Sequence, residues 1–492
     1  MIKDEKNTSG TSSNNSRRNF LKATAVAAAG FLIVPRHVLG GKGFLAPSDR
    51  LTIASIGVGG KGESDINSFY GSGKADIAYL CDVDDRRAAN SVLKFPKAKY
   101  YKDWRELFDK EAKNFDAVSV STPDHNHAIQ TMAAMQLGKH VYVQKPLTHD
   151  IYEARVLTEA AKRYKVVTQM GNQGASGDGV RQMREWYDSN AIGDVHTVYC
   201  WTDRPVWPQG ISWPGTKAEV PKELNWDLWL GTAPYKEYVD KLVPFNWRGW
   251  WDYGTGALGD MGCHQLEAPF SILGLKYAAD VQASVGSVYV DEFQRGYFPE
   301  SFPPSSHVTL TFAKTNKTKG PVTLHWMDGG IQPERPEELG PNEVFGGGGN
   351  GILLIGTKGK MMAGTYARDP QLLPTSRTSA FKVNKKHQLA RVPGGAEGHY
   401  AQWVEACIAG YGNMEVSSPF EVAGPLTEAL HMANLAIRGY DIRKPKASGN
   451  GYDYPGRGIK LIWDNDNMKV TNFDEVNQFV KREYRSGWNM AI

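Results

Sequence analysis

Short apolar runs alternate with helical patterns between residues 50 and 173. Such a run, bounded by turn residues, predicts a buried β-strand, and apolar positions three and four apart predict a helix. The helical patterns begin near His127 and Ile151. Strand and helix in regular succession predict a doubly wound parallel sheet with helices on both faces. The strand-like runs are Leu51–Ile56, 76–84, Ala117–Val120, His140–Val143 and Val166–Met170.

The pattern changes after residue 174. Amphipathic helices are expected at 398–410 and 425–439. Runs in which apolar and polar residues alternate predict an open, mostly antiparallel sheet backed by helices, which makes an α+β domain. We therefore expect domains at 50–173 and 174–440, followed by a tail, 441–492, that packs on the body. The alternating runs lie at 194–201, 280–290, 307–312 and 321–328.

Residues 1–40 have a different composition. The polar start, rich in Ser and Asn, is followed by the basic stretch Ser16–Lys22 and the apolar run Ala23–Val34. An apolar run of about 12 residues is too short to cross a bilayer but suits the centre of a signal peptide. Arg17 and Arg18 resemble the twin-arginine export signal, and a basic leader with two chance arginines is the alternative. We expect a periplasmic or otherwise exported protein without an integral membrane span.

Composition and charge narrow the function further. The 492 residues exceed one ordinary domain, and 41% apolar with 22% charged residues is typical of a globular chain. A net charge of +4 without a long run of one sign predicts no nucleic-acid partner. The four cysteines form no CxxC pair, which argues against a disulfide framework or a zinc ribbon. His125 and His127 have no obvious third ligand, so no metal site is predicted.

A glycine-rich loop that matches G-x-G-x-x-G follows the first strand. Glycines allow the tight turn, let the backbone approach a pyrophosphate and let the next helix pack closely. The second strand ends near Asp82, where a carboxylate hydrogen-bonds the adenosine ribose and repels a 2′-phosphate. NAD is therefore favoured over NADP, although Arg86 and Arg87 leave NADP possible, and a plain surface aspartate is the alternative. The loop residues are Gly57, Val58, Gly59, Gly60, Lys61 and Gly62.

Three more loops follow strands of the predicted parallel sheet, at 121–127, 144–150 and 171–174. The carboxyl ends of parallel strands share one edge of the sheet, and ligands bind there. We expect the first loop to approach the cofactor and the third to contact the substrate or the nicotinamide amide. The candidate residues are Ser121, Thr122, Pro123 and His127 for the cofactor, with Asn172 and Gln173 for the substrate.

Four motifs occur in an order that resembles the Gfo/Idh/MocA oxidoreductases, a family that includes glucose-fructose oxidoreductase and inositol dehydrogenases. The resemblance covers almost everything after residue 50, and the tail resembles a subgroup of exported bacterial members. It implies a Rossmann domain that binds NAD(P), an α+β substrate domain, one late helix packed back on the first domain, and homo-oligomers formed through the open sheet face. The motifs are the glycine loop, STPDHNHA at 121–128, GKHVYVQKPL at 138–147 and GALGDMGCHQLE at 256–267.

The resemblance implies that Lys145 reaches the substrate hydroxyl being oxidised and lies beside the nicotinamide. The usual motif is E-K-P, and Gln144 here replaces the acidic residue. Without a negative neighbour, the pKa of Lys145 should fall relative to other members of the family. Both residues are also expected to contact the cofactor.

Asp260 and His264 lie four residues apart, so a helix from Gly259 onward would place them on one face. The resemblance implies that His264 acts as acid and base opposite Lys145, with Asp260 beside it to orient and stabilise the imidazole. From the residues alone, a helix N-cap at Asp260, a surface pair of side chains and a metal pair are the alternatives.

Tryptophans gather in the loops that precede this helix. Sugar C–H faces pack on aromatic rings, so some of them, with Trp250 as a candidate, are expected in a carbohydrate site. Packing in the core or at an oligomer interface is the alternative for about half of them. The Pro- and Gly-rich loop Gln332–Gly351 is long enough to be a lid or an interface arm. The tryptophans in question are Trp201, Trp207, Trp213, Trp247, Trp250 and Trp251.

Together these features predict an exported NAD(P)-dependent oxidoreductase that acts on a sugar, cyclitol or glycoside hydroxyl, with Lys145, Asp260 and His264 handling the proton. The cofactor would be exported with the folded protein and reset within the site by a second substrate. Alternatively, hydride could return to the same substrate after elimination or hydrolysis, which would make the protein a redox-neutral glycosidase or lyase. A catalytically inactive, cofactor-bearing sugar-binding protein is the remaining alternative.

Overall fold

The computed structural model describes residues 49–491, and its first sheet is the predicted doubly wound parallel sheet. Its six strands have the order β3-β2-β1-β4-β5-β6, and every neighbouring pair is parallel. The strand order reverses between β1 and β4, and ligands bind at such a switch point in open α/β sheets. The strands are β1 Leu51–Ile56, β2 Ala75–Cys81, β3 Lys99–Tyr101, β4 Ala117–Val120, β5 His140–Gln144 and β6 Thr168–Gly171.

Helices connect these strands, and the sequence places an aspartate at the start of three of them. The carboxylates of Asp84, Asp103 and Asp150 accept hydrogen bonds from backbone N–H groups of the first turn. Such caps satisfy donors that the helix itself leaves unpaired, which fixes where the helix begins. The helices are α3 Lys61–Gly71, α4 Asp85–Lys94, α5 Trp104–Glu111, α6 His127–Gln136 and α7 Ile151–Tyr164.

The second sheet has nine strands in the order β15-β14-β13-β7-β12-β11-β8-β18-β19. It is mostly antiparallel, as predicted, and only the pairing of β7 with β12 is parallel among those recorded for residues 49–491. In β11, buried and half-exposed residues alternate, because one face lies against helices. Its strands are β7 Val195–Trp201, β8 Ala278–Val285, β11 Ser306–Phe312, β12 Val322–Met327, β13 Gly351–Gly356, β14 Gly359–Ala363, β15 Gln371–Leu373, β18 Leu461–Asp464 and β19 Lys469–Val470.

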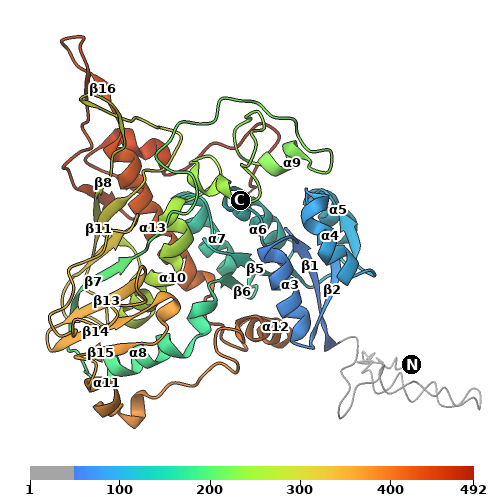
Figure 1. Ribbon diagram of the computed structural model, residues 1–492. Helices are drawn as coiled ribbons and strands as arrows, with labels where there is room; N and C mark the ends of the chain where they lie inside the picture. Colours follow the sequence, from blue (N-terminus) through green and yellow to red (C-terminus); the bar gives the residue numbers. More distant parts are fainter. Residues whose placement is uncertain (1–48, 492) are drawn as a thin grey trace, which may run out of the picture. The chain divides into compact units, whose positions relative to one another are not determined.

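Two long buried helices, α10 (Gly256–Leu273) and α13 (Phe420–Tyr440), lie between the two sheets and pack on each other (Figure 1). The chain also returns to the first domain through α12 (His399–Ala409), whose Trp403 shares an apolar cluster with Phe69 of α3. This is the late helix that the resemblance implied. The remaining short elements are α8 Asp178–Asp188, α9 Trp226–Leu230, α11 Arg377–Ala380, and the hairpins β9 Tyr289–Asp291 with β10 Gln294–Arg295 and β16 Lys444–Pro445 with β17 Tyr452–Asp453.

Helix α10 begins one turn earlier than expected, at Gly256 rather than near Gly259. Asp260 therefore lies inside the helix, and the N-cap alternative for this residue is wrong. The domain limits at 173 and 440 stay predictions, and the predicted leader, 1–40, lies outside the described residues. Across residues 49–491, no helix is both long enough and apolar enough to cross a bilayer.

Candidate active site

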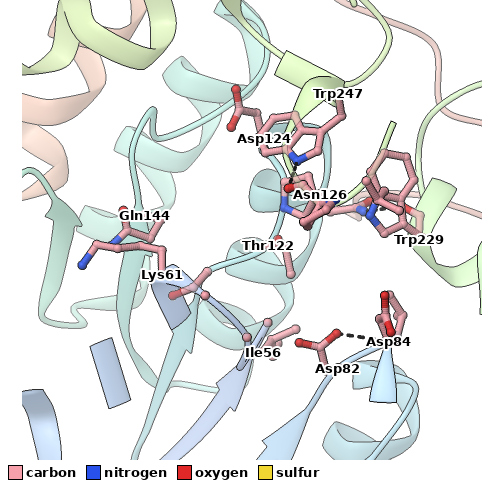
Figure 2. Close-up of a pocket in the computed structure, with 18 of the residues that line it drawn as sticks. Ile56, Lys61, Asp82, Asp84, Thr122, Asp124, Asn126, Gln144, Trp229 and Trp247 are labelled. Carbon is pink, nitrogen blue, oxygen red and sulfur yellow. Dashed lines mark hydrogen bonds between the residues drawn. The ribbon is translucent and has the colours of Figure 1, made fainter. Parts of the chain in front are cut away.

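A cavity of about 330 Å³ follows the edge of the parallel sheet at which its strands end (Figure 2). Its floor comes from the loops after five consecutive strands of the sheet order. Lys145 follows β5, Thr122 follows β4, Gly57 follows β1, Asp82 follows β2 and Asp103 follows β3. The cavity is thus elongated across the switch point, in the place where open α/β sheets bind dinucleotides.

The glycine loop leaves room only for backbone at its closest points. Gly57 has φ +76°, and a Cβ there would lie 2.6 Å from the carbonyl oxygen of Ser121. A Cβ on Gly62 would lie 1.8 Å from the carbonyl oxygen of Gly57, so only glycine lets α3 begin this close to β1. The N-terminus of α3 borders the cavity through Gly60 and Lys61, and a helix start offers N–H groups to phosphate. The loop therefore fits a dinucleotide pyrophosphate.

Asp82 is held in place by two backbone N–H groups. Its two carboxylate oxygens accept from the N–H of Val58 at 2.9 Å and of Asp84 at 3.0 Å. Burial raises the pKa of Asp82, and these hydrogen bonds oppose the rise. Arg86 is committed to Asp84 through two short hydrogen bonds, whereas Arg87 borders the cavity beside the glycine loop. A carboxylate acceptor held in this way fits an adenosine ribose whose free hydroxyls donate to it.

At the other end of the cavity, Lys145 forms an ion pair with Asp260 across the two domains. The Lys145 Nζ donates to Asp260 Oδ1 at 2.6 Å and to the Asp260 carbonyl oxygen at 3.0 Å. Arg248 approaches the same carboxylate oxygen to 3.6 Å, and its guanidinium lies on the ring of Trp247. Burial alone would raise the pKa of Asp260, but Lys145 and Arg248 lower it below its usual range.

Gln144 has a polar partner other than Lys145, and the comparison of the Lys145 pKa with other members of the family stays a prediction. The Gln144 Nε2 donates at 2.8 Å to Asp65, a buried carboxylate of α3, so Gln144 does not act as the polar partner of Lys145. Burial opposes the charge on Lys145, yet the neighbouring Asp260 raises the pKa of Lys145 above its ordinary value. The charge state of this lysine is thus set across the domain interface and not by the preceding residue in the chain.

His264 lies beside this ion pair, four residues after Asp260 on α10. Its Nδ1 is 2.9 Å from Oδ1 of Asn172, the residue that follows β6. The Asn172 amide nitrogen donates to the Cys263 carbonyl oxygen at 2.9 Å and to Glu267 Oε2 at 2.8 Å. Burial lowers the pKa of His264 to about 3, and the positive Lys145 adds to this effect. The imidazole is therefore neutral near pH 7 and able to accept a proton.

Several predicted site residues do not line the cavity. His127 is buried, with Nδ1 2.8 Å from the Pro146 carbonyl oxygen and Nε2 2.8 Å from the Thr122 carbonyl oxygen. It therefore positions the two loops that carry Lys145 and Thr122, and it offers no ring nitrogen to a cofactor. Trp250 is only 2% exposed and packs in an aromatic cluster, so the substrate contact proposed for it is wrong in this structure.

Of the other predicted residues, Val58 has a buried side chain. Its contribution to the site is its backbone N–H, which donates to the Asp82 carboxylate. Asn172 contacts His264 and not the cavity, and Gln173 donates to the hydroxyl groups of Tyr142 and Tyr400. His264 itself is 5% exposed and is not among the residues that line the cavity, although Asp260 on the same helix is. The predicted residues that do line the cavity are Gly57, Gly59, Gly60, Lys61, Asp82, Ser121, Thr122, Pro123, Gln144, Lys145 and Asp260.

Sequence reasoning missed several residues on the opposite side of the cavity. Trp229 and Trp247 come from the segment between β7 and α10 (Figure 2), and Trp488 comes from the tail. Trp247 was one of the tryptophans of which some were expected in a carbohydrate site, whereas Trp229 and Trp488 were not predicted. Asp124 also lines the cavity, where Thr255 donates to its carboxylate at 2.6 Å and burial raises its pKa. A weak signal existed for Asp124, because it lies inside the STPDHNHA motif, but nothing in the sequence placed Trp488 there.

Two family models match parts of the two domains described above. Residues 51–172 match the oxidoreductase family's NAD-binding Rossmann fold, and residues 194–293 match its C-terminal alpha/beta domain. The chain belongs to the Gfo/Idh/MocA oxidoreductase family. Its first domain is an NAD-binding domain, and a further model, for the twin-arginine translocation signal, matches residues 14–33 and indicates export by that route.

Relatives within this family match parts of the chain. A glycosyl hydrolase family 109 protein from Shewanella baltica is 29% identical over 171 residues, which is 30% of this chain and 37% of that protein. Levoglucosan dehydrogenase from Pseudarthrobacter phenanthrenivorans is 23% identical over 196 residues, which is 40% of this chain and 42% of that protein. The matched regions thus span less than half the length of these relatives.

Solved structures of the family share the fold across nearly their whole length. Levoglucosan dehydrogenase in complex with NADH and levoglucosan has a TM-score of 0.53 at 16% identity, covering 79% of this chain and 97% of its own. The WlbA dehydrogenase from Bordetella pertussis, in complex with NADH and UDP-GlcNAcA, has a TM-score of 0.54 at 14% identity, covering 84% and 99%. At these identities the likeness concerns the fold alone.

Proposed function

We propose that this protein is an exported, periplasmic NAD-dependent oxidoreductase that oxidises a hydroxyl of a sugar, cyclitol or glycoside. The observation that carries the proposal is the Lys145–Asp260 ion pair beside a neutral His264, at the end of a cavity that starts at the glycine loop. The NADH-bound sugar-related neighbours and the matched export signal support it.

In this proposal, each residue of the site has one defined role. The Lys145 ammonium, fixed by Asp260, donates a hydrogen bond to the substrate oxygen and orients the reacting carbon. His264, held by Asn172, accepts the hydroxyl proton at its free Nε2 as the carbonyl forms. Bound NAD would supply the hydride acceptor. Trp247 and Arg248 exclude water from one side of the reacting carbon and leave the ion pair poorly screened.

A redox-neutral route is the second candidate, and one observation favours it. Asp124 is a second carboxyl group in the cavity, separate from Asp260, and burial raises its pKa. In this version Asp124 is the general acid, and its carboxyl group would donate a proton to a leaving glycosidic oxygen after the ring is oxidised. The matched relatives named as glycosyl hydrolase family 109 proteins support this version.

The test uses protein purified from its export route without added cofactor. After denaturation, the supernatant is assayed for NAD(P)(H), and one equivalent of nicotinamide nucleotide per chain is expected. Glycosides are then screened for cleavage and sugar pairs for exchange, which separates the two candidates by their products. A protein that contains no nicotinamide nucleotide and binds none when it is added would contradict both candidates.

Two further properties belong to the proposal. Lys145→Ala and His264→Ala should abolish turnover, whereas a catalytically inactive sugar-binding protein would bind sugar equally well with either change.

We also expect a homo-oligomer that forms through the open face of the nine-stranded sheet, where the rings of Tyr199 and His325 stack 4.6 Å apart. Light scattering after gel filtration measures the mass, and a monomer at all concentrations would contradict this part.

A further inference from the structure

The cavity has a defined direction. Lys145 follows β5 and Asp82 follows β2, and in the sheet order β3 comes next after β2. A dinucleotide with its pyrophosphate at the glycine loop and its adenosine ribose at Asp82 would extend its base toward the loop after β3. That loop contributes Asp103 and Trp104 to the cavity wall. The adenine end therefore lies between β2 and the start of α5.

The wall opposite this loop comes from the far end of the chain. Trp488 lines the cavity there although it is 9% exposed, and it is the fifth residue from the C-terminus. The guanidinium of Arg105, in the first turn of α5, lies 4.4 Å from the centre of its ring. This contact fixes the indole against α5 and leaves part of the ring on the cavity.

The tail reaches this position by way of polar anchors. Arg482 and Tyr484 both hydrogen-bond Oε1 of the buried Glu153 in α7, at 2.8 and 2.7 Å. Arg485 bonds the carboxylate of Asp227, and its N–H donates to the Thr232 carbonyl oxygen at 3.1 Å. A hollow of about 570 Å³ remains beneath the tail, bordered by Glu153, Tyr484 and Trp488 themselves. Residues 482–488 are thus fastened by separate polar contacts, whereas earlier tail residues such as Val476 and Val480 belong to the hydrophobic core.

We propose that the C-terminal tail completes the cofactor site, with Trp488 packing against the adenine end of the bound dinucleotide and retaining it. This inference rests on the proposed function, because an exported oxidoreductase must keep its cofactor where free NAD is scarce. A flat aromatic ring stabilises a base through its π-face, whatever the chemistry at the nicotinamide end. The site is complete only after the segment that carries Trp488 has folded onto α5, which suits export of a folded, loaded protein.

The test measures binding of NAD and of ADP-ribose, which lacks the nicotinamide ring, by calorimetry on full-length protein stripped of nucleotide. Loss of the indole in Trp488→Ala should raise both dissociation constants by the same factor, about tenfold, and Trp488→Phe should raise them less. Nucleotide content after gel filtration of unstripped protein should fall in parallel. Neither readout depends on turnover.

Met490→Ala is the matched control, because Met490 also belongs to the tail and lines the hollow but not the cavity. A second variant, Arg485→Ala, removes an anchor and leaves the indole, and it should weaken both ligands about threefold. Equal binding by Trp488→Ala and Met490→Ala, or weakening of NAD alone, would overturn the proposal. Wild-type protein that binds neither ligand would instead refute the proposed function, and this inference with it.

Discussion

The amide oxygen of Asn172 accepts a hydrogen bond from Nδ1 of His264, at 2.9 Å. The orientation of this amide is fixed by its nitrogen, which faces two acceptors, the Cys263 carbonyl oxygen and the Glu267 carboxyl. Because the amide oxygen can only accept, Nδ1 must carry the imidazole proton. The lone pair is then on Nε2, and a neutral His264 is a base in a defined tautomer.

Asn172→Asp should move the pH profile of turnover. A carboxylate next to Nδ1 stabilises the imidazolium, so the pKa of His264 should rise from its low value of about 3 toward its ordinary range. The acidic limb of kcat/KM should therefore move to higher pH, and activity at pH 5 should fall relative to pH 8. We would combine the change with Glu267→Gln, because the new carboxylate would otherwise face the Glu267 carboxyl.

Gln173→Glu is the control for this experiment. It places the same charge one residue later in the chain, where the side chain contacts Tyr142 and Tyr400 and not His264. Its pH profile should resemble that of the wild type. If both variants shift the acidic limb equally, the hydrogen bond between Asn172 and His264 does not control the base.

Lys145→Met should lower kcat by at least about 100-fold, because it removes the hydrogen-bond donor to the substrate oxygen. Asp260 would retain only Arg248, at 3.6 Å, so the pKa of Asp260 should rise. NAD binding, measured by calorimetry, should change little. Lys139→Met is the control: Lys139 donates to the Phe115 carbonyl oxygen, and it is not among the residues that line the cavity. Full turnover in Lys145→Met would contradict the role of Lys145.

The sequence was sufficient for five of the six strands of the parallel sheet and for the residues that follow most of them. The three-residue edge strand β3, with Asp103 after it, was not predicted. Strand β1 begins and ends where the apolar run does, and the loops after β1, β2, β4 and β5 meet at one edge, as parallel topology requires. The spacing of Asp260 and His264 was informative for a related reason, because helix geometry alone places them on one face.

The sequence was not sufficient for contacts between segments far apart in the chain. The partner of Lys145 lies 115 residues away, and local pattern gave no reason to prefer it over the neighbouring Gln144. His127 occurs in a cofactor motif, but each of its two ring nitrogens lies against a backbone carbonyl oxygen of the protein. Neither nitrogen is left to contact a cofactor. Trp247 and Trp250 are three residues apart in one aromatic stretch, and only packing decides which of them faces the cavity.

Asp82 should make the protein selective for NAD over NADP. Its carboxylate is held at the adenosine ribose position by the N–H groups of Val58 and Asp84, and it would repel a 2′-phosphate. Asp82→Ser should narrow the ratio of the NADP and NAD dissociation constants by about tenfold, mainly through tighter NADP binding. Asp85→Asn removes a nearby exposed carboxylate and should leave the ratio unchanged. An equal ratio for wild type and Asp82→Ser would contradict this role.

Acid should destabilise the fold through buried neutral histidines. Burial lowers the pKa of His125 and His264 to about 3 and that of His399 and His431 to about 4. Each of these side chains takes up a proton more readily in the unfolded chain, where its pKa is about 6.5. Their contribution to stability is therefore complete above pH 6.5 and is lost as pH falls toward the folded values, by about 1.4 kcal/mol per pH unit for each histidine.

Glu267 works in the opposite direction. Burial raises its pKa to about 7, so its contribution is present below its unfolded pKa near 4.5 and is lost as pH rises through 7. Asp150 and Asp328 act in the same direction as Glu267, because burial raises their pKa to about 8 and about 6. Urea unfolding at pH 7, 6 and 5 measures the sum, and we expect the free energy of unfolding to fall with acid. The reason is that the four histidines named above, together with His325, outnumber these three carboxyl groups. His399→Gln should reduce that slope by about one proton, whereas His196→Asn, at an exposed site on β7, should leave it unchanged. An unchanged slope in His399→Gln would mean that this histidine is already charged in the folded protein.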